Sequence, residues 1–161
     1  METKIKTVKA SQVQKIELVL PNDTNILGNL LGGRLMHWID IAAALSASRH
    51  CNSVAVTAAV DNLNFHHPIK LGDIVLLKAS VNRAFSTSME VGVKVEIENF
   101  MTGEILHSNS AYLTFVSINR ETMKPQPVPP IVPESEEEKR RYEQALRRRE
   151  QRLSEKHGIV H

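Results

Sequence analysis

Cysteine is almost absent from this sequence, which carries a single one, Cys51. One thiol cannot form an internal disulfide or a cysteine-rich metal cluster, so we expect a small buried side chain in a reducing compartment. The chain also lacks a run of about 20 apolar residues, which a membrane span would need, and its first residues contain no apolar signal core. These absences predict a cytoplasmic protein that does not associate with a membrane.

Neither sign of charge dominates the sequence. Its 20 lysines and arginines oppose 18 aspartates and glutamates, which leaves a net charge of +2 at pH 7. Binding to nucleic acid or to an anionic membrane surface is typical of proteins with a clear basic excess, so the totals predict neither partner. A length of 161 residues suffices for one domain with a sizeable core and a tail.

One apolar stretch organises the sequence. Apolar residues lie on nearly every helical face from Leu35 to Ala47, which predicts a helix over about 32–50 that is surrounded by protein. Asp40 interrupts this pattern, and a carboxylate without water is costly unless a partner or a reaction requires it. Gly33 stands at the start of the helix, where free N–H groups and the helix dipole favour a developing negative charge. The helix therefore combines an acid/base side chain with an oxyanion-binding end.

Strand patterns surround this helix. Residues 7–20 predict a first strand with an irregularity near Ala10, and four strand-like segments follow the helix. These four are Val54–Phe65, Ile74–Phe85, Met89–Glu98 and Ile105–Ile118. In Met89–Glu98 apolar residues alternate with charged ones, including Glu90 and Lys94, which predicts one dry and one wet face. An all-round apolar helix and one-sided strands pack best as an antiparallel sheet curled around the helix, in an α+β fold.

A sheet curled around a helix leaves one side of that helix uncovered. The sequence therefore predicts that a second copy of the chain covers it, in a dimer or a larger assembly.

Proline and charge dominate the C-terminal part. Five of the nine residues in 125–133 are proline, which predicts a stiff connector without a core of its own after a domain of residues 1–124. Ser135 and Glu138 form a capping box that opens a charged helix within 134–161. Two interpretations of this helix remain open: it lies on the domain as a solvated element, or its arginines bind phosphate.

Several motifs follow one another in a fixed order along the chain. They are Asp23-Thr-Asn25, Gly28-Asn29, Gly32-Gly33, Asp40, Arg49-His-Cys51, Asp61-x-x-x-Phe65-x-x-Pro68-x-x-x-Gly72-Asp73 and Ser88-Met-Glu-Val91. Each motif is common by itself, but their order and spacing over residues 10–155 resemble the cytosolic acyl-CoA hydrolases, which are thioesterases with the hot-dog fold.

This resemblance implies hydrolysis of acyl-CoA to free fatty acid and coenzyme A in fatty acid metabolism, without a metal or another cofactor. In the family the functional pair is the aspartate of the central helix and the asparagine before the glycines, which correspond to Asp40 and Asn25. The resemblance also implies that different subunits contribute the two residues and that the assembly is a trimer of dimers, a hexamer.

The chemistry of these residue types agrees with that role. A carboxylate that deprotonates a water, or attacks directly, suffices for a reactive thioester, and the Gly33 N–H is the expected oxyanion donor. The structural alternatives are a buried Asp40 bonded to His37, one turn earlier, and an Asn25 that only stabilises a turn.

Coenzyme A carries phosphates, which arginine, small hydroxyls and backbone N–H groups bind. The resemblance places the segment after Arg83 near the pantetheine arm. We therefore expect coenzyme A to contact Arg83, Ser86, Thr87 and Ser88, with Arg49 as a further phosphate ligand.

The adjacent residues His66 and His67 do not predict a metal site. Neighbouring side chains of an extended segment point in opposite directions, and no third ligand is spaced to join them.

Two rival functions remain open on the same fold: a non-catalytic acyl-CoA sensor and a hydratase of enoyl thioesters. Release of free coenzyme A separates a hydrolase from a sensor. A hydratase removes the enoyl absorbance and leaves the thioester intact, and hot-dog hydratases are expected to use an aspartate and a histidine as a pair.

Overall fold

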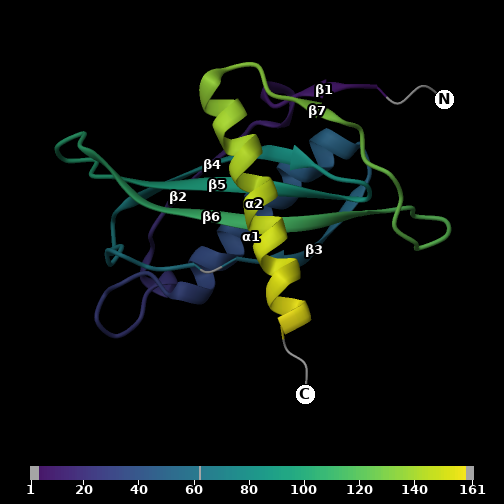
Figure 1. The fold of residues 1–161 in the computed structure, drawn as a ribbon. Helices are drawn as coiled ribbons and strands as arrows, with labels where there is room; N and C mark the ends of the chain where they lie inside the picture. Colours follow the sequence, from purple (N-terminus) through teal and green to yellow (C-terminus); the bar gives the residue numbers. More distant parts are fainter. Residues whose placement is uncertain (1–3, 62, 159–161) are drawn as a thin grey trace.

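The computed structural model describes residues 4–61 and 63–158. Within these residues, a five-stranded antiparallel sheet curls around one long helix, α1 (Gly32–Cys51), as the sequence predicts (Figure 1). The strands are β2 (Val13–Leu18), β3 (Val54–Val60), β4 (Ile74–Ala84), β5 (Ser88–Glu98) and β6 (Ile105–Ile118), in the order β2-β4-β5-β6-β3. The α+β arrangement is thereby confirmed, and β3 forms one edge of the sheet.

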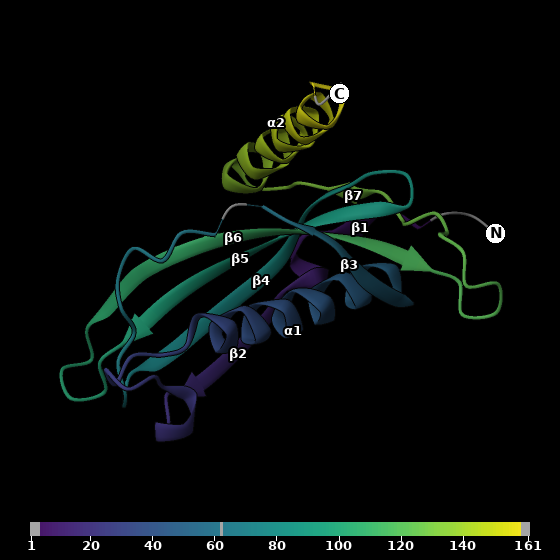
Figure 2. The same cartoon turned by 90° about the horizontal axis from the view of Figure 1, so that it is seen from below.

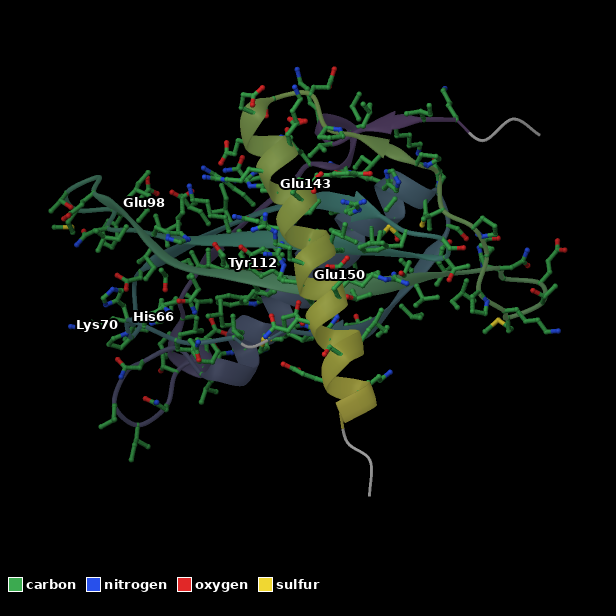
Figure 3. The ribbon with its side chains drawn as sticks, viewed as in Figure 1. His66, Lys70, Glu98, Tyr112, Glu143 and Glu150 are labelled. Atoms are coloured by element: carbon green, nitrogen blue, oxygen red, sulfur yellow. The ribbon has the colours of Figure 1, made fainter. Side chains whose placement is uncertain are left out.

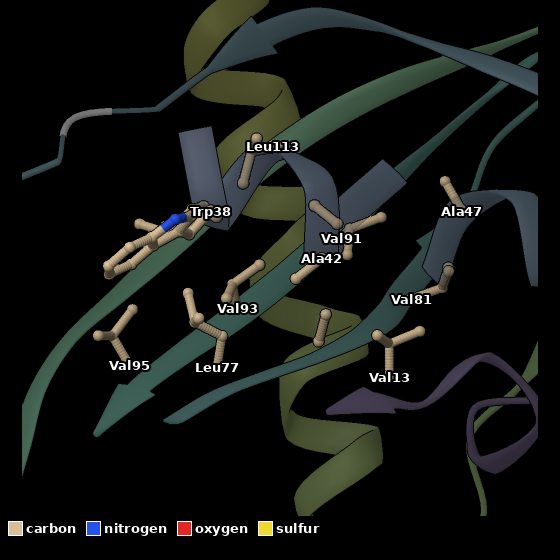
Figure 4. Close-up of a cluster of buried hydrophobic side chains, with 14 of the residues drawn as sticks. Val13, Trp38, Ala42, Ala47, Leu77, Val81, Val91, Val93, Val95 and Leu113 are labelled. Atoms are coloured by element: carbon tan, nitrogen blue, oxygen red, sulfur yellow. The ribbon is translucent and has the colours of Figure 1, made fainter. Parts of the chain in front are cut away.

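The two long helices lie on opposite faces of the sheet. Figure 2 shows α1 within the concave face and α2 (Glu136–Gly158) across the outer face. The main core fills the space between α1 and the sheet, where Trp38, Ala42 and Ala47 of the helix meet inward-facing strand residues (Figure 4). Those strand residues include Leu77, Val81, Val91, Val93, Val95 and Leu113. Each buried aliphatic side chain of this kind contributes about 1.5–3 kcal/mol, so the alternating pattern of the strands fixes which face holds α1.

One face of α1 remains uncovered within the protomer. Gly33, His37 and Leu45 are exposed although the helix sequence is largely apolar. The helix ends where Asn52 takes a left-handed conformation, with φ of 52°, and donates its N–H to the Ser48 carbonyl at 2.7 Å. This uncovered face of α1 agrees with the prediction that a second copy of the chain packs against the helix.

The predicted irregularity in the N-terminal strand is a short 3-10 turn (Lys9–Ser11) between β1 (Lys6–Thr7) and β2. Ser11 is fully buried in this turn, and its hydroxyl accepts a hydrogen bond from the Val81 N–H at 2.9 Å. Its carbonyl accepts another from the Ser46 hydroxyl of α1 at 2.7 Å. The turn therefore joins the N-terminal segment to both the sheet and the central helix.

The strand after α1 is shorter than predicted. It ends at Val60 rather than Phe65. The Asp61 N–H still donates to the Tyr112 carbonyl of β6 at 2.9 Å, and its carboxylate pairs with Arg152 of α2 at 2.7 Å. The segment that follows turns back toward the start of α1, where the ring of Phe65 lies against Gly32.

The proline-rich connector has no core of its own, but it packs into the core of the domain, which its proline pattern did not predict. Val128 and Ile131 alternate with the prolines and are buried in the hydrophobic core. The short strand β7 (Ile131–Val132) also pairs in parallel with β1. Proline fixes an extended backbone here, and the apolar residues between the prolines use it to pack into the domain.

The alternation in β5 predicts a solvent-exposed outer face, but the structure differs at Glu90. This side chain is 0% exposed because α2 covers it. Arg148 of α2 binds this carboxylate through two hydrogen bonds, of 2.6 and 3.0 Å, and its guanidinium lies 3.6 Å from the centre of the Tyr112 ring. Figure 3 shows Tyr112 beside α2. Of the two interpretations of the charged helix, its position on the domain is therefore observed, with arginine making part of the packing. No helix of residues 4–61 and 63–158 is both long and apolar enough to cross a membrane.

Candidate active site

Asp40 lies midway along α1, on the side of the helix that faces β3. The Thr57 hydroxyl donates a hydrogen bond to Asp40 Oδ1 at 2.7 Å. Asp40 is half-buried and Thr57 is exposed, so the pair opens to the surface of the protomer at the edge of the sheet. Because Thr57 occupies only one of the two carboxylate oxygens, Oδ2 is left to receive a proton from a bound water.

A β-bulge adjoins this pair. The pairing of β3 with β6 shifts after Thr57, so that Ala58 has no partner and Ala59 opposes Thr114. Bulges bend a strand and redirect side chains, and they are common next to active sites. The bulge therefore ends the regular ladder directly after the residue that binds Asp40.

Thr57 is the residue that sequence reasoning missed. It stands in a run of valine and alanine, where a threonine is an ordinary strand residue. Among the described residues, the donor to Asp40 is Thr57 rather than His37, so the structural alternative, an Asp40 bonded to His37, is not observed.

Asn25 stabilises the loop before α1. Its side-chain oxygen accepts hydrogen bonds from the backbone N–H groups of Leu27 at 2.9 Å and Asn29 at 3.2 Å. The turn role proposed from the sequence is therefore observed. The two bonds fix the side-chain oxygen, which leaves the amide NH2 as a donor held in a defined orientation.

The start of α1 offers backbone donors beside this loop. The Arg34 and Leu35 N–H groups both donate to the Leu31 carbonyl at 3.1 Å, so the N–H groups of Gly32 and Gly33 precede the hydrogen-bonded ladder. A Cβ on Gly33 would meet no atom within 4 Å. A substrate carbonyl can therefore approach this backbone closely.

A hollow of about 330 Å3 lies at this end of the helix. Its lining includes Asn25, Gly32 and Phe65, but not Asp40. Asp40 lies about 10 Å farther along the helix axis than Gly33. A single protomer thus holds Asn25 at one place and the pair of Asp40 and Thr57 at another.

The predicted coenzyme A ligands after β4 lie under α2. Arg83 and Arg149 flank the Phe85 ring, with the Arg149 guanidinium 4.3 Å from its centre, and the Ser88 hydroxyl accepts a bond from Arg149 at 3.4 Å. The structure thus brings Arg83 and Ser88 together and adds Arg149, which the sequence did not single out.

The other candidates have backbone roles in this segment and at the end of α1. The carbonyls of Ser86 and Thr87 accept hydrogen bonds from Val128 and Ser117, both at 3.0 Å. Arg49 donates to the Gln12 carbonyl at 2.5 Å and so holds the N-terminal segment against α1.

His66 and His67 are exposed, and Figure 3 shows His66 away from α2. Among residues 4–61 and 63–158, no three histidine, cysteine, aspartate or glutamate side chains gather in a way that could hold a metal ion.

Comparison with known proteins gives concordant matches. The family model described as the thioesterase superfamily matches residues 27–103. The acyl-CoA thioester hydrolase YkhA of Bacillus subtilis is 43% identical over 148 residues, which cover 92% of this chain and 86% of that protein.

Solved structures match over nearly the whole chain. An apo-hexameric acyl-CoA thioesterase superposes with a TM-score of 0.91 and 40% identity, covering 98% of this chain and 99% of that one. The acyl-CoA hydrolase of Staphylococcus aureus, solved with butyryl coenzyme A and coenzyme A, has a TM-score of 0.86 and 37% identity, with 97% of both chains covered. Variants of that hydrolase with an aspartate, an asparagine or a threonine replaced by alanine are also among the matches.

Proposed function

Since this chain belongs to the thioesterase superfamily and is an acyl-CoA thioester hydrolase, we propose that Asp40 activates the water that attacks the thioester. The observation that carries this proposal is the hydrogen bond from Thr57 to Asp40 at 2.7 Å. It fixes one carboxylate oxygen and presents the other at an open edge of the protomer. A carboxylate held in this way is a suitable general base.

In the proposed reaction, water gives a proton to Asp40 while its oxygen attacks the thioester carbon. The resulting oxyanion is stabilised by the Gly33 N–H and by the Asn25 amide, both of which are donors. The carbon–sulfur bond then breaks, the proton held by Asp40 passes to the coenzyme A thiolate, and the acid leaves. No metal or other cofactor is required, because a thioester carbonyl is already a good electrophile.

The variants of the Staphylococcus aureus hydrolase support this choice of residues. Its replaced asparagine, aspartate and threonine are spaced along that chain as Asn25, Asp40 and Thr57 are spaced along this one.

A second copy of the chain completes the site in this proposal. The uncovered face of α1 adjoins the edge strand β3, and both carry exposed apolar side chains, namely Leu45, Val54, Val56 and Val60. An unpaired edge and an apolar patch of this kind are typical of a subunit interface. A two-fold partner on this face would bring the loop that holds Asn25 over the Asp40 of the first protomer. Three such dimers would form the hexamer seen in the apo-hexameric relative.

Mixing two inactive variants tests the shared site. Asn25→Ala and Asp40→Asn subunits, unfolded and refolded together, are expected to regain part of the wild-type activity. Each mixed dimer carries one site with both lesions and one site with neither. Dimer formation is checked by mass. Mixed dimers that are no more active than the parents would show that Asn25 serves its own chain.

The reaction itself is tested by detecting free thiol. The purified protein is expected to release coenzyme A from a series of acyl-CoA thioesters of increasing chain length, and thiol release should equal the acid formed. Binding without thiol release would instead identify an acyl-CoA sensor. Loss of the enoyl absorbance with the thioester intact would identify a hydratase.

We further propose that the phosphates of coenzyme A lie near Arg83 and Ser88, where Arg149 supplies a second guanidinium. This placement of the phosphates is supported by Phe85, whose ring lies against the guanidinium groups of both arginines, Arg83 and Arg149. A cytoplasmic location fits the free thiol of Cys51.

A further inference from the structure

A groove of about 780 Å3 lies between the first half of α2 and the outer face of the sheet. Figure 2 shows that α2 lies on the opposite face of the sheet from α1, the helix that carries Asp40. Its size is that of a small-molecule site. The reaction proposed above uses none of the side chains that line it.

The floor of the groove is a row of hydrogen-bond donors. Gln14, Lys78, Lys94 and Ser110 are direct cross-strand neighbours on β2, β4, β5 and β6, and all four line the groove. Neighbouring strands are about 4.8 Å apart, so the row spans about 14 Å. An amide, two ammonium groups and a hydroxyl thus stand side by side.

The two lysines at the centre of this row are an unfavourable pair by themselves. Lys78 and Lys94 lie directly opposite each other, and like charges in that position destabilise a sheet. Beside them, the Asn82 side chain packs over Gly92, where a Cβ would come within 2.7 Å of its amide nitrogen.

The roof of the groove is also basic. Arg140, Arg141 and Gln144 of α2 line it from above. Two carboxylates offset part of the charge: Glu96 pairs with Lys78 at 2.8 Å, and Glu137 pairs with Arg141 at 2.6 Å. Four cations against two anions leave the groove positive, and Lys94 has no carboxylate partner among the described residues.

We propose that this groove binds a small polyanion with adjacent phosphate groups, such as a diphosphate. Guanidinium groups above and ammonium groups below match the oxygens of two linked phosphates, and the amide and hydroxyl of the row supply further donors. An acyl chain does not suit it, since the lining is largely polar. The bound anion would also join α2 to the sheet, because it contacts both.

Calorimetric titration of the full chain with inorganic pyrophosphate, in the absence of any thioester, tests the site. Binding is expected, and Lys94→Gln and Arg140→Gln should each weaken it about tenfold. Arg147→Gln is the matched control, because Arg147 is exposed on the same helix and does not line the groove. Citrate provides an anion of similar charge without phosphate. Absence of pyrophosphate binding, equal affinity in all variants, or equally tight citrate binding would overturn the proposal.

Two sources could supply the diphosphate, a free phosphate compound or coenzyme A itself. The KM for acyl-CoA in Lys94→Gln separates them. A KM that rises in parallel with the loss of pyrophosphate binding assigns the groove to the substrate's own phosphates. An unchanged KM with lost pyrophosphate binding assigns it to a separate ligand. Neither result affects the proposed role of Asp40, which depends on kcat.

Discussion

Asp40→Asn is expected to lower kcat by about 10²–10⁴-fold, the usual contribution of a general base, while the protein stays folded and assembled. The amide is nearly isosteric with the carboxylate and can still accept the hydrogen bond from Thr57. It cannot take a proton from water. The measurement is the rate of coenzyme A release at saturating acyl-CoA, with circular dichroism and mass to confirm the fold and the assembly.

Two other substitutions serve as comparisons for the loss of kcat in Asp40→Asn. Thr57→Val keeps the carboxylate but removes its donor, so its effect on kcat should be clearly smaller than that of Asp40→Asn. His37→Gln changes an exposed residue one turn away on the same helix and should leave kcat within about twofold of the wild type. Full activity in a folded Asp40→Asn protein would remove Asp40 from the mechanism.

Arg148→Ala is expected to destabilise the protein by about 3 kcal/mol, because it leaves the buried carboxylate of Glu90 without its counter-charge. Burial lowers the pKa of Arg148, but the hydrogen bonds and the charge of Glu90 outweigh this effect and raise the pKa above its ordinary value. Arg148 is thus charged throughout the physiological range. For a chain of this size the loss corresponds to a fall in Tm of about 6–12 °C, measured by thermal unfolding.

The neighbouring residue provides the control. Arg147→Ala removes the same charge from an exposed position of α2 and should change the stability by no more than about 0.5 kcal/mol. The double variant Glu90→Leu with Arg148→Met removes both charges and should recover most of the loss. Equal Tm values for Arg148→Ala and Arg147→Ala would mean that the ion pair does not hold α2 on the sheet.

The elements whose pattern is local could be predicted from the sequence. Apolar residues at helical spacing identified α1, and strict alternation identified β5 and β6. The end of β3 could not be predicted, because the contacts of Asp61 there are with Tyr112 and Arg152, which are far from it in the chain. The burial of Glu90 could not be predicted for the same reason. Its pattern is that of a solvent-facing residue, and only the position of α2 buries it.

The residues of the candidate site also fall into two groups, those that the sequence predicts and one that it does not. Asp40 is visible in the sequence as a charge in an apolar helix, and Asn25 stands among turn residues. Thr57 has no such signal, because its role arises only when β3 lies against α1. The packing of the connector could not be predicted from its high proline content. It depends on Val128 and Ile131, which lie between the prolines.

The parallel pairing of β1 with β7 sets an order of events during synthesis. Lys6 lies beside Ile131, so β1 finds its partner only after α1 and the five strands of the main sheet have been made. Until then the N-terminal residues have no ladder to join. Release of the chain before Ile131 would therefore leave β1 without its partner strand and the domain without α2 on its outer face.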